Sequence, residues 1–222
     1  MTRVLVLRPE PGASATVERA RKRGLEAVAA PLFEIEPVEW DAPEAASFDA
    51  MLLTSANAVR HAGEKLKDLR GLPVHAIGSA TAEAAREAGF DVASSGDAGV
   101  DRLLGSIEPD LKLLRLAGED RKAPANARQE ITAITVYRSK PRASETEFND
   151  DDVLLVHSPR ASRRLAELVA PDRRSRISVA AFSTEAADAT GDGWAAVEAA
   201  DAPNDDALLA LAERLCNNLP KP

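Results

Sequence analysis

Short apolar runs alternate along the chain with longer stretches of helical periodicity. The apolar runs are continuous, as expected for strands of a parallel sheet that is covered on both faces. The predicted strands are residues 4–7, 27–31, 51–53, 74–77, 111–116, 131–137, 153–156 and 177–182. The predicted helices include residues 13–23, 57–66, 81–88, 162–168 and 205–216. This order predicts an α/β fold made of βαβ units with right-handed crossovers.

Two strand–helix segments occur twice in the sequence. Residues 48–55 (Phe-Asp-Ala-Met-Leu-Leu-Thr-Ser) resemble residues 151–158 (Asp-Asp-Val-Leu-Leu-Val-His-Ser), with Ser55 opposite Ser158. The segment that begins at residue 76 resembles the one that begins at residue 180, with Thr81 opposite Thr184. Ser55 and Ser158 are 103 residues apart, and so are Thr81 and Thr184. The constant spacing predicts two copies of one domain.

A weaker similarity relates residues 3–37 to residues 112–141. Each is predicted as strand, helix, strand and an extended stretch that ends at a proline. If both copies contain this unit, one copy is continuous in sequence and the other is split. The predicted domains are residues 1–34 plus 141–222, which form a discontinuous domain, and residues 37–136, with linker strands at 34–37 and 137–141. Two such crossings predict a hinge with a cleft beside it.

The predicted carboxyl ends of the strands are rich in hydroxyl groups and in strand-to-helix turns. Ligands of open α/β sheets lie at these ends. The candidate binding residues there are Arg8, Ser55, Gly78, Ser79, Thr81, Gly118, Ser158, Ser183 and Thr184. Each hydroxyl also has an ordinary structural role as a helix N-cap. The same helix N-termini offer N–H groups to anions, so several of them together suit a ligand with many carboxylates.

Tyr137 is the only tyrosine of the chain and lies at the second predicted crossing. One interpretation is that it packs on the sheet as an ordinary strand aromatic. The other is functional, because a phenol is a neutral hydrogen-bond donor at pH 7. Such a donor can protonate or orient a departing hydroxyl group.

The composition argues against several classes of function. A formal net charge of −8 disfavours an extended nucleic-acid surface. One cysteine and three scattered histidines give no metal-ligand spacing, and no nucleotide-binding glycine motif or Gly-x-Ser-x-Gly occurs. We therefore expect no metal and no organic cofactor. The first residues do not read as a signal peptide, and no apolar run approaches the ~18 residues of a membrane span, so we expect a cytoplasmic protein.

Several short motifs, taken together and in order, resemble the uroporphyrinogen-III synthases. They are Val-Leu-Val-Leu-Arg-Pro at 4–9, Pro-Leu-Phe-Glu-Ile at 31–35, Leu-Thr-Ser-Ala-Asn-Ala-Val at 53–59, Ala-Ile-Gly-Ser-Ala-Thr at 76–81, Leu-Ala-Gly-Glu at 116–119 and Thr-Val-Tyr-Arg at 135–138. The resemblance covers nearly the whole chain. It implies two flavodoxin-like domains joined by a two-stranded linker, one of them discontinuous. It also implies an enzyme without a cofactor, and we expect a monomer that contacts neither nucleic acid nor membrane.

The resemblance further implies a substrate and a reaction. The substrate is hydroxymethylbilane, a linear tetrapyrrole with eight carboxylates, which is closed to uroporphyrinogen III with inversion of ring D and loss of water. Tyr137 matches the active-site tyrosine of the family, and Ser55, Thr81 and Thr184 match its cleft hydroxyls. Ser158 enters as the counterpart of Ser55 in the repeat.

The chain departs from the family at one turn. The family turn Ile-Gly-Pro-Thr-Thr-Ala reads Ala-Phe-Ser-Thr-Glu-Ala at residues 181–186, which sets Phe182 in place of the glycine and adds the negative charge of Glu185. A second function stays open, namely a hinged module that binds or senses a small anion without catalysis. An acyl or phosphoryl transferase would lack its nucleophile or its phosphate-binding loop.

Overall fold

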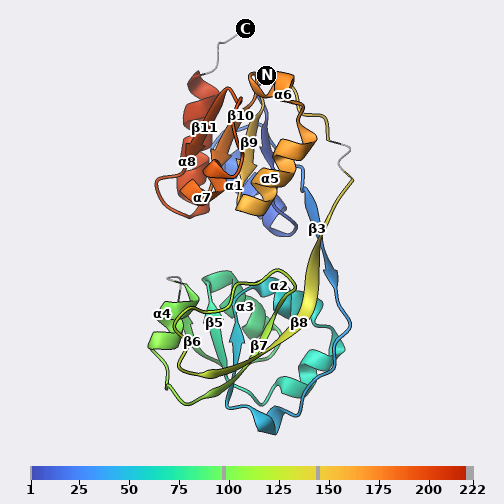
Figure 1. The fold of residues 1–222 in the computed structure, drawn as a ribbon, viewed down its shortest axis with the longest axis vertical. Coiled ribbons are helices and arrows are strands. Elements are labelled where there is room, and N and C mark those ends of the chain that lie inside the picture. Colours follow the sequence, from blue (N-terminus) through green and yellow to red (C-terminus); the bar gives the residue numbers. More distant parts are fainter. Residues whose placement is uncertain (1, 97–98, 144–145, 219–222) are drawn as a thin grey trace. The chain divides into compact units, whose positions relative to one another are not determined.

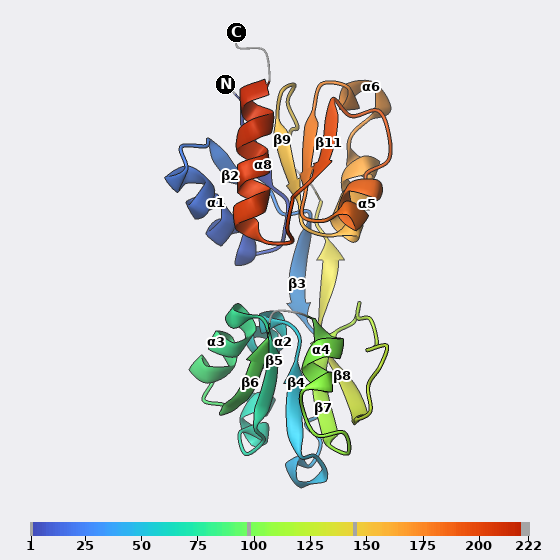
Figure 2. The ribbon, with the colours of Figure 1, turned by 90° about the vertical axis from the view of Figure 1, so that its left-hand side faces the viewer.

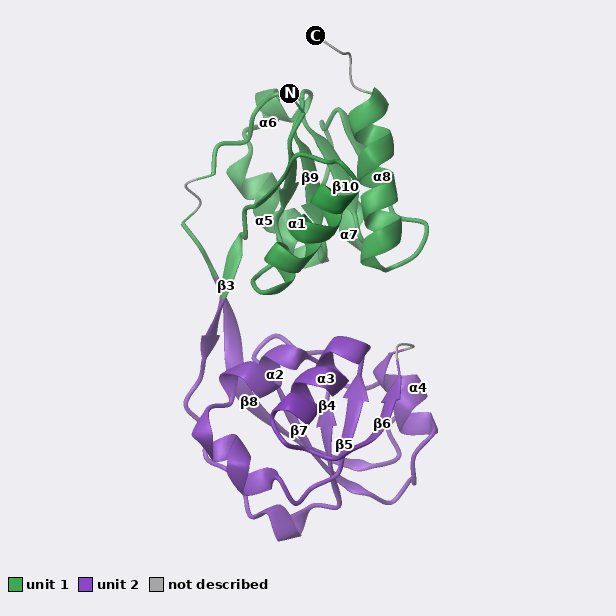
Figure 3. Ribbon diagram, turned by 180° about the vertical axis from the view of Figure 1, so that it is seen from behind, with its two compact units in different colours: residues 1–34, 141–222 green, residues 35–140 purple. Residues whose placement is uncertain are grey.

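The chain forms two compact units. The structure is a computed structural model that describes residues 2–96, 99–143 and 146–218. Unit 1 consists of Met1–Glu34 and Pro141–Pro222, and unit 2 consists of Ile35–Lys140 (Figure 3). The chain therefore leaves unit 1 after residue 34, forms the whole of unit 2, and returns at residue 141.

Within its described residues, unit 1 has a five-stranded parallel sheet in the order β11–β10–β9–β1–β2 (Figures 1 and 2). The strands are β1 (Val4–Val6), β2 (Ala27–Ala29), β9 (Val153–Val156), β10 (Ser178–Ala181) and β11 (Ala196–Ala199). Numbered along this unit, the order is 2-1-3-4-5, as in flavodoxin-like folds.

Helices cover both faces of this sheet, which explains why its strands are continuous apolar runs. The helices are α1 (Gly12–Lys22), α5 (Pro159–Leu168), α6 (Pro171–Arg174), α7 (Thr184–Asp188) and α8 (Asp205–Asn218). Leu5 and Leu154 pack in one core cluster with side chains of α5 and α7. Val6 and Leu155 pack in another with side chains of α1 and α8.

Unit 2 carries a six-stranded sheet, over the residues that are described, in the order β3–β8–β7–β4–β5–β6. The strands are β3 (Phe33–Pro37), β4 (Ala50–Leu53), β5 (Val74–Ile77), β6 (Val92–Gly96), β7 (Lys112–Gly118) and β8 (Glu130–Pro141). Its α-helices are α2 (Ala56–His61), α3 (Ser79–Glu87) and α4 (Val100–Gly105), and two 3₁₀ helices span Ala45–Ser47 and Glu64–Leu69. The predicted α/β fold with two parallel-sheet domains is confirmed.

Five strands of the unit 2 sheet lie in the same spatial order as the five strands of unit 1. The chain connects them in a different sequence. Matching β7 and β8 of unit 2 with β1 and β2 of unit 1 makes β8–β7–β4–β5–β6 equivalent to β2–β1–β9–β10–β11. The registers agree as well, because Ala50 pairs with Leu113 as Val153 pairs with Val4. Unit 2 is therefore a circularly permuted copy of the fold of unit 1.

The spacing of 103 residues is correct for the first repeated pair. Ser55 and Ser158 are the N-caps of α2 and α5, and both have an extended backbone with φ of −157° and −159°. The hydroxyl oxygen of Ser55 accepts the N–H of Asn57 at 3.2 Å, and that of Ser158 accepts the N–H of Ala161 at 3.2 Å. The two serines occupy the same place in their units.

The spacing of 103 residues is wrong for the second pair. Leu53 pairs with Ala76 in unit 2, and its counterpart Val156 pairs with Ala181 in unit 1, which is a spacing of 105 residues from Ala76. The N-caps that follow, Gly78 and Ser183, keep this spacing.

Unit 1 therefore has two more residues between these strands than unit 2. In unit 1, the ten residues of α5 and the short α6 fill this connection, whereas unit 2 has the six residues of α2 and a 3₁₀ helix. Consequently Thr184, the first residue of α7, is not the counterpart of Thr81, the third residue of α3. Phe182 stands opposite Ile77 and does not replace the glycine, because Ser183 occupies the position of Gly78.

The similarity between residues 3–37 and 112–141 predicted a helix between the strands that are now β7 and β8, and this prediction is wrong. Residues 119–129, all of which are described, contain no helix. This segment includes Pro124 and lacks the apolar stripe that a packed helix needs. It is tied to α4 instead, since the Asp101 carboxylate accepts the N–H of Ala125 at 2.9 Å and Gln129 Nε2 donates to the Leu104 carbonyl at 2.9 Å.

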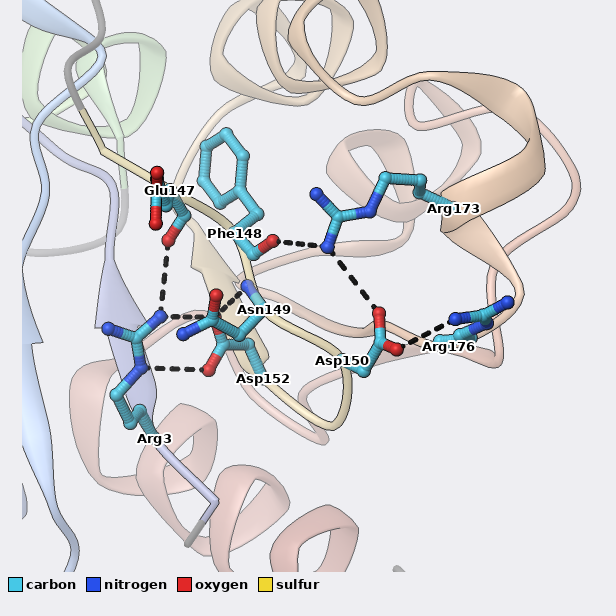
Figure 4. Close-up of polar contacts among 8 residues, drawn as sticks. All are labelled: Arg3, Glu147, Phe148, Asn149, Asp150, Asp152, Arg173 and Arg176. Carbon is cyan, nitrogen blue, oxygen red and sulfur yellow. Dashed lines mark hydrogen bonds and ion pairs between the residues drawn. The ribbon is translucent and has the colours of Figure 1, made fainter.

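An arginine–aspartate cluster holds the amino-terminal edge of the unit 1 sheet (Figure 4). Arg3 donates from Nε and Nη2 to the two carboxylate oxygens of Asp152, at 3.0 and 2.7 Å. Asp152 also accepts the N–H of Asn149 at 2.7 Å, and Arg173 donates to the carbonyl of Phe148 at 2.8 Å. These bonds fix the chain where it enters β9, at the edge opposite to the carboxyl ends of the strands.

Candidate functional site

The carboxyl edge of the unit 2 sheet gathers most of the predicted site residues of that unit. Because β4, β5, β7 and β8 are parallel neighbours in one sheet, the residues at their carboxyl ends share one edge. They are Ser55 after β4, Gly78, Ser79 and Thr81 after β5, Gly118 at the end of β7, and Tyr137 on β8.

Tyr137 and Gly118 are direct partners on this edge. The register between β7 and β8 shifts by one residue at this point, because Ala117 pairs with Thr135 and Gly118 with Tyr137. Such bulges re-aim a side chain at the end of a ladder. The N–H of Glu119 donates to the Tyr137 carbonyl at 2.9 Å, which fixes the backbone of the tyrosine. The half-buried ring packs against the core beneath α2 and α3.

His61 is a neighbour of Tyr137 that sequence reasoning missed. The centroids of the two rings are 6.4 Å apart and the rings are tilted by 41°. Burial lowers the pKa of His61, and the charge of Arg60 lowers it further. The imidazole next to the tyrosine is therefore neutral at pH 7. No local signal in the sequence indicated this contact, because the predicted helix covered residues 57–66, whereas α2 ends at His61.

The helix N-termini of this edge differ in how they are capped. The hydroxyl oxygen of Ser55 caps α2 by accepting one N–H, so its O–H group remains as the donor for an anionic ligand. The N-cap of α3 is Gly78, whose φ of +85° favours glycine and which offers no side chain to the helix N–H groups. Ser79 is exposed beside it, whereas Thr81 is buried, with its Oγ1 4.0 Å from where a Gly78 Cβ would lie. The N-terminus of α3 is thus the more open anion site of the two.

The carboxyl edge of unit 1 is occupied by its own side chains. Asp205, the first residue of α8, accepts from Thr16 Oγ1 at 2.8 Å, Arg19 Nη1 at 3.2 Å and Arg8 Nη1 at 3.3 Å. Burial alone would raise the pKa of Asp205, but contacts from His157 and Thr16 and the charge of Arg8 outweigh it and lower the pKa to about 2. Arg8 is therefore held by an internal carboxylate.

His157 completes this cluster and was also missed as a site residue. Its Nε2 lies 3.4 Å from Asp205 Oδ1 without a hydrogen bond, and the contact would be an ion pair only if the imidazole were protonated. Its ring stacks on Phe182 with centroids 5.5 Å apart. Burial lowers the pKa of His157, while Asp205 acts in the opposite direction. In the sequence, the feature that could have identified His157 is its position between a predicted strand and the N-cap Ser158.

The remaining predicted residues of unit 1 lie at the starts of two helices. Ser158 caps α5, and Ser183 caps α7 by accepting the N–H of Ala186 at 3.3 Å. Thr184 follows as the first residue of α7. The predicted set thus divides between the two units, with Arg8, Ser158, Ser183 and Thr184 in unit 1 and the others in unit 2.

Groups that would hold a metal are not found in the described part of the chain, since no three His, Cys, Asp or Glu side chains gather there. No described helix is long and apolar enough to cross a membrane.

Residues 14–210 match the protein family described as uroporphyrinogen-III synthase HemD. The chain belongs to the uroporphyrinogen-III synthase family. A search of curated proteins finds no match.

Solved structures of uroporphyrinogen-III synthases share this fold. The enzyme from Helicobacter pylori 26695 superposes with a TM-score of 0.68 at 16% sequence identity, over 97% of this chain and 100% of that chain. A mutant uroporphyrinogen III synthase from the extremely thermophilic bacterium Thermus thermophilus superposes with a TM-score of 0.55 at 19% identity, over 99% and 100%. At sequence identities this low, the structural likeness shows the fold alone.

Proposed function

We propose that this chain is a uroporphyrinogen-III synthase, which closes hydroxymethylbilane to uroporphyrinogen III with inversion of ring D and loss of water. The observation that carries the proposal is the combination of family membership over residues 14–210 with the position of Tyr137. The only tyrosine of the chain lies at the carboxyl edge of unit 2, against Gly118 and at a shift in strand register. In this proposal the protein acts as a monomer on a small tetrapyrrole, without nucleic acid or membrane.

The first step breaks a carbon–oxygen bond. A pyrrole nitrogen lone pair expels the terminal hydroxyl group of the substrate and leaves an electrophilic azafulvene in its N-protonated, cationic form. The Tyr137 phenol donates a hydrogen bond to the departing oxygen, which leaves as water once it has gained a proton. The neutral imidazole of His61 adds no charge beside this phenol.

The second step decides which isomer is formed. The azafulvene carbon can bond to the unsubstituted end of ring D, which gives the type I isomer without help. For the type III isomer it must bond to the substituted α-carbon of ring D, giving a spiro intermediate that breaks one bond and forms another, with ring D reversed. Loss of a proton then restores the pyrrole. The protein's contribution is chiefly to position the rings.

To position the rings, the protein must bind the acetate and propionate arms of the substrate. The N-terminus of α3 at Gly78 and Ser79 offers N–H groups and a hydroxyl to these carboxylates. The O–H group of Ser55 extends this set of neutral donors in unit 2, and in unit 1 the O–H groups of Ser158 and Ser183 are donors of the same kind. Arg8 binds Asp205, so we assign it to the support of unit 1 and not to direct contact with substrate.

The test is the isomer of the product. Hydroxymethylbilane is made in place by a hydroxymethylbilane synthase, and the products are oxidised to porphyrins and separated by chromatography. We expect type III as the main isomer with the chain present and type I without it. Type I alone, formed at the spontaneous rate, would refute catalysis. Saturable binding of the substrate without conversion would instead support the anion-binding module that the sequence left open.

A further inference from the structure

Arg115 is a buried cation without an anionic partner in the described part of the chain. It lies on β7 and is 6% exposed. A guanidinium has five N–H donors, of which Arg115 uses one to the Lys122 carbonyl at 2.9 Å and one to Thr54 Oγ1 at 3.3 Å. Its buried Nε has no hydrogen-bond partner there. Buried charges are normally paired, so this arrangement needs an explanation.

The same position in unit 1 is apolar. Leu52 pairs with Arg115 in unit 2, and its counterpart Leu155 pairs with Val6 in unit 1, so Val6 is the equivalent of Arg115. Val6 is fully buried in a cluster with Ala13 and Val17 of α1. Unit 2 has no helix at the place of α1, because residues 119–129 form a loop. The fold therefore does not require a charge at this position.

A cavity of about 280 Å³ lies where that helix is missing. Its lining includes two arginines, Arg115 and Arg121, and the small or apolar side chains of Ala123, Ala127, Ile131 and Ala133. This volume is slightly below the range of pockets that enclose a whole ligand, and suits one arm of a larger molecule. An apolar wall with a cationic end matches a short carbon chain that carries a carboxylate.

Arg121 adds a second positive charge to this cavity. Its Nη1 donates to the carbonyl of Gly118 at 3.0 Å and to Thr135 Oγ1 at 2.7 Å, which places it beside the carboxyl edge that holds Tyr137. Burial lowers the pKa of Arg115, and the charge of Arg121 lowers it further. A bound anion would relieve both effects, since it would compensate the desolvation of one guanidinium and the repulsion between the two.

We propose that Arg115 and Arg121 form a carboxylate-binding pocket of unit 2, which takes one acetate or propionate arm of the tetrapyrrole substrate. The identity of that substrate rests on the proposed function. The pocket itself rests on the unpaired guanidinium, the cavity and the contrast with Val6. It recognises the carboxylate by charge and by the N–H donors that Arg115 leaves unused.

The pocket is tested first by NMR of the whole chain. The Nε–Hε resonance of Arg115, identified by its loss in Arg115→Gln, is followed during titration with sodium propionate and, separately, with sodium chloride at the same ionic strength. We expect a saturable shift with propionate only. No shift, or an equal shift with chloride, would overturn the pocket. This readout does not depend on synthase activity, so it separates the pocket from the proposed function.

The role toward substrate is tested by kinetics. We expect Arg115→Gln to raise the KM for hydroxymethylbilane about ten- to hundredfold, with Arg115→Lys recovering part of the loss. The control is Arg86→Gln, because Arg86 is exposed in the last turn of α3, at the end opposite to Gly78. An unchanged KM in a folded Arg115→Gln variant would refute substrate contact. If the wild-type chain binds propionate but makes no type III isomer, the proposed function fails and the pocket stands.

Discussion

The ring of Tyr137 lies so close to Gly118 that a methyl group at Gly118 would be 2.7 Å from the tyrosine Cε2 and Cζ atoms and 3.0 Å from the phenol oxygen. Real Cβ contacts of 2.7 Å are essentially never observed, so one of the two residues would have to move. The tyrosine ring thus occupies the space that a side chain at residue 118 would fill. The absence of a side chain at one residue sets the position of the phenol at another.

Gly118→Ala should therefore displace the Tyr137 ring while the sheet stays intact. Because misplacement of a reacting group by about 1 Å can cost on the order of 100-fold, we expect kcat for type III formation to fall about 10- to 100-fold. Circular dichroism should show an unchanged fold. The matched control is Gly71→Ala, since a Cβ at Gly71 would meet no described atom within 4 Å. Equal activity of both variants would contradict the close-contact argument.

Tyr137→Phe tests the phenol itself, without moving the ring. If the phenol assists departure of the hydroxyl group, kcat should fall roughly 10- to 1000-fold, with little change in KM. The measurement is the initial rate of type III formation against substrate concentration. A variant with wild-type kcat would show that the ring only packs at this edge, and the role of donor would be withdrawn.

Acid should destabilise unit 1 in two windows of pH. The folded-state pKa of His157 is lowered, so the unfolded chain takes up a proton first, and stability falls as the pH drops below about 6.5. The pKa of Asp205 is lowered to about 2, so its contribution is complete above about pH 4 and is lost as the pH falls towards 2. Burial also lowers the pKa of His61 and His75, which lie in unit 2, so acid should destabilise that unit in the same range as the first window.

Urea unfolding at pH 7, 6 and 5 measures the first window. We expect the wild-type chain to lose stability over this range and His157→Asn to lose measurably less. The difference isolates His157 from the other two histidines, which the variant retains. Parallel curves for the two proteins would mean that His157 has the same pKa in both states. The Asp205 window is measured by unfolding at pH 4, 3 and 2.

Asp152→Asn should destabilise unit 1 by roughly 3 kcal/mol. The side chain of Asp152 is 2% exposed, and its replacement leaves Arg3 without its bidentate partner in a partly buried setting. The neighbouring Asp150→Asn is the control, because Asp150 pairs with Arg173 and Arg176 on the exposed surface (Figure 4). We expect the control to melt close to wild type. A similar melting temperature for both variants would contradict the distinction between buried and exposed pairs.

Continuous apolar runs made the central strands easy to predict. The bounds predicted for β5 and β9 agree with the structure, because both faces of these strands are covered and nearly every position is apolar. The edge strands β6 and β11 were not predicted, since their residues are half-buried or exposed and mix Ser, Gly and Glu with apolar side chains. The helix expected between β7 and β8 came from analogy with the other copy, and the local sequence overrode it.

Only those residues of the candidate site that directly follow a predicted strand could be predicted from the sequence. The hydroxyls after β4, β5 and β9 could be located because a strand followed by Ser or Gly and a helix is a local pattern. The tie between Arg8 and Asp205 spans nearly the whole chain and depends on how α8 packs, so no local pattern shows it. The contact of His61 with Tyr137 and the isolation of Arg115 likewise depend on packing and register.

The permuted order of the strands also affects how the chain is completed during synthesis. Unit 2 is made of one continuous stretch, so all of its strands have been translated once residue 141 has been added. In unit 1, β1 pairs with β9, so the first strand of the chain lacks a partner on one side until residues 153–156 are made. The sheet of unit 1 therefore cannot be completed until every strand of unit 2 has been translated.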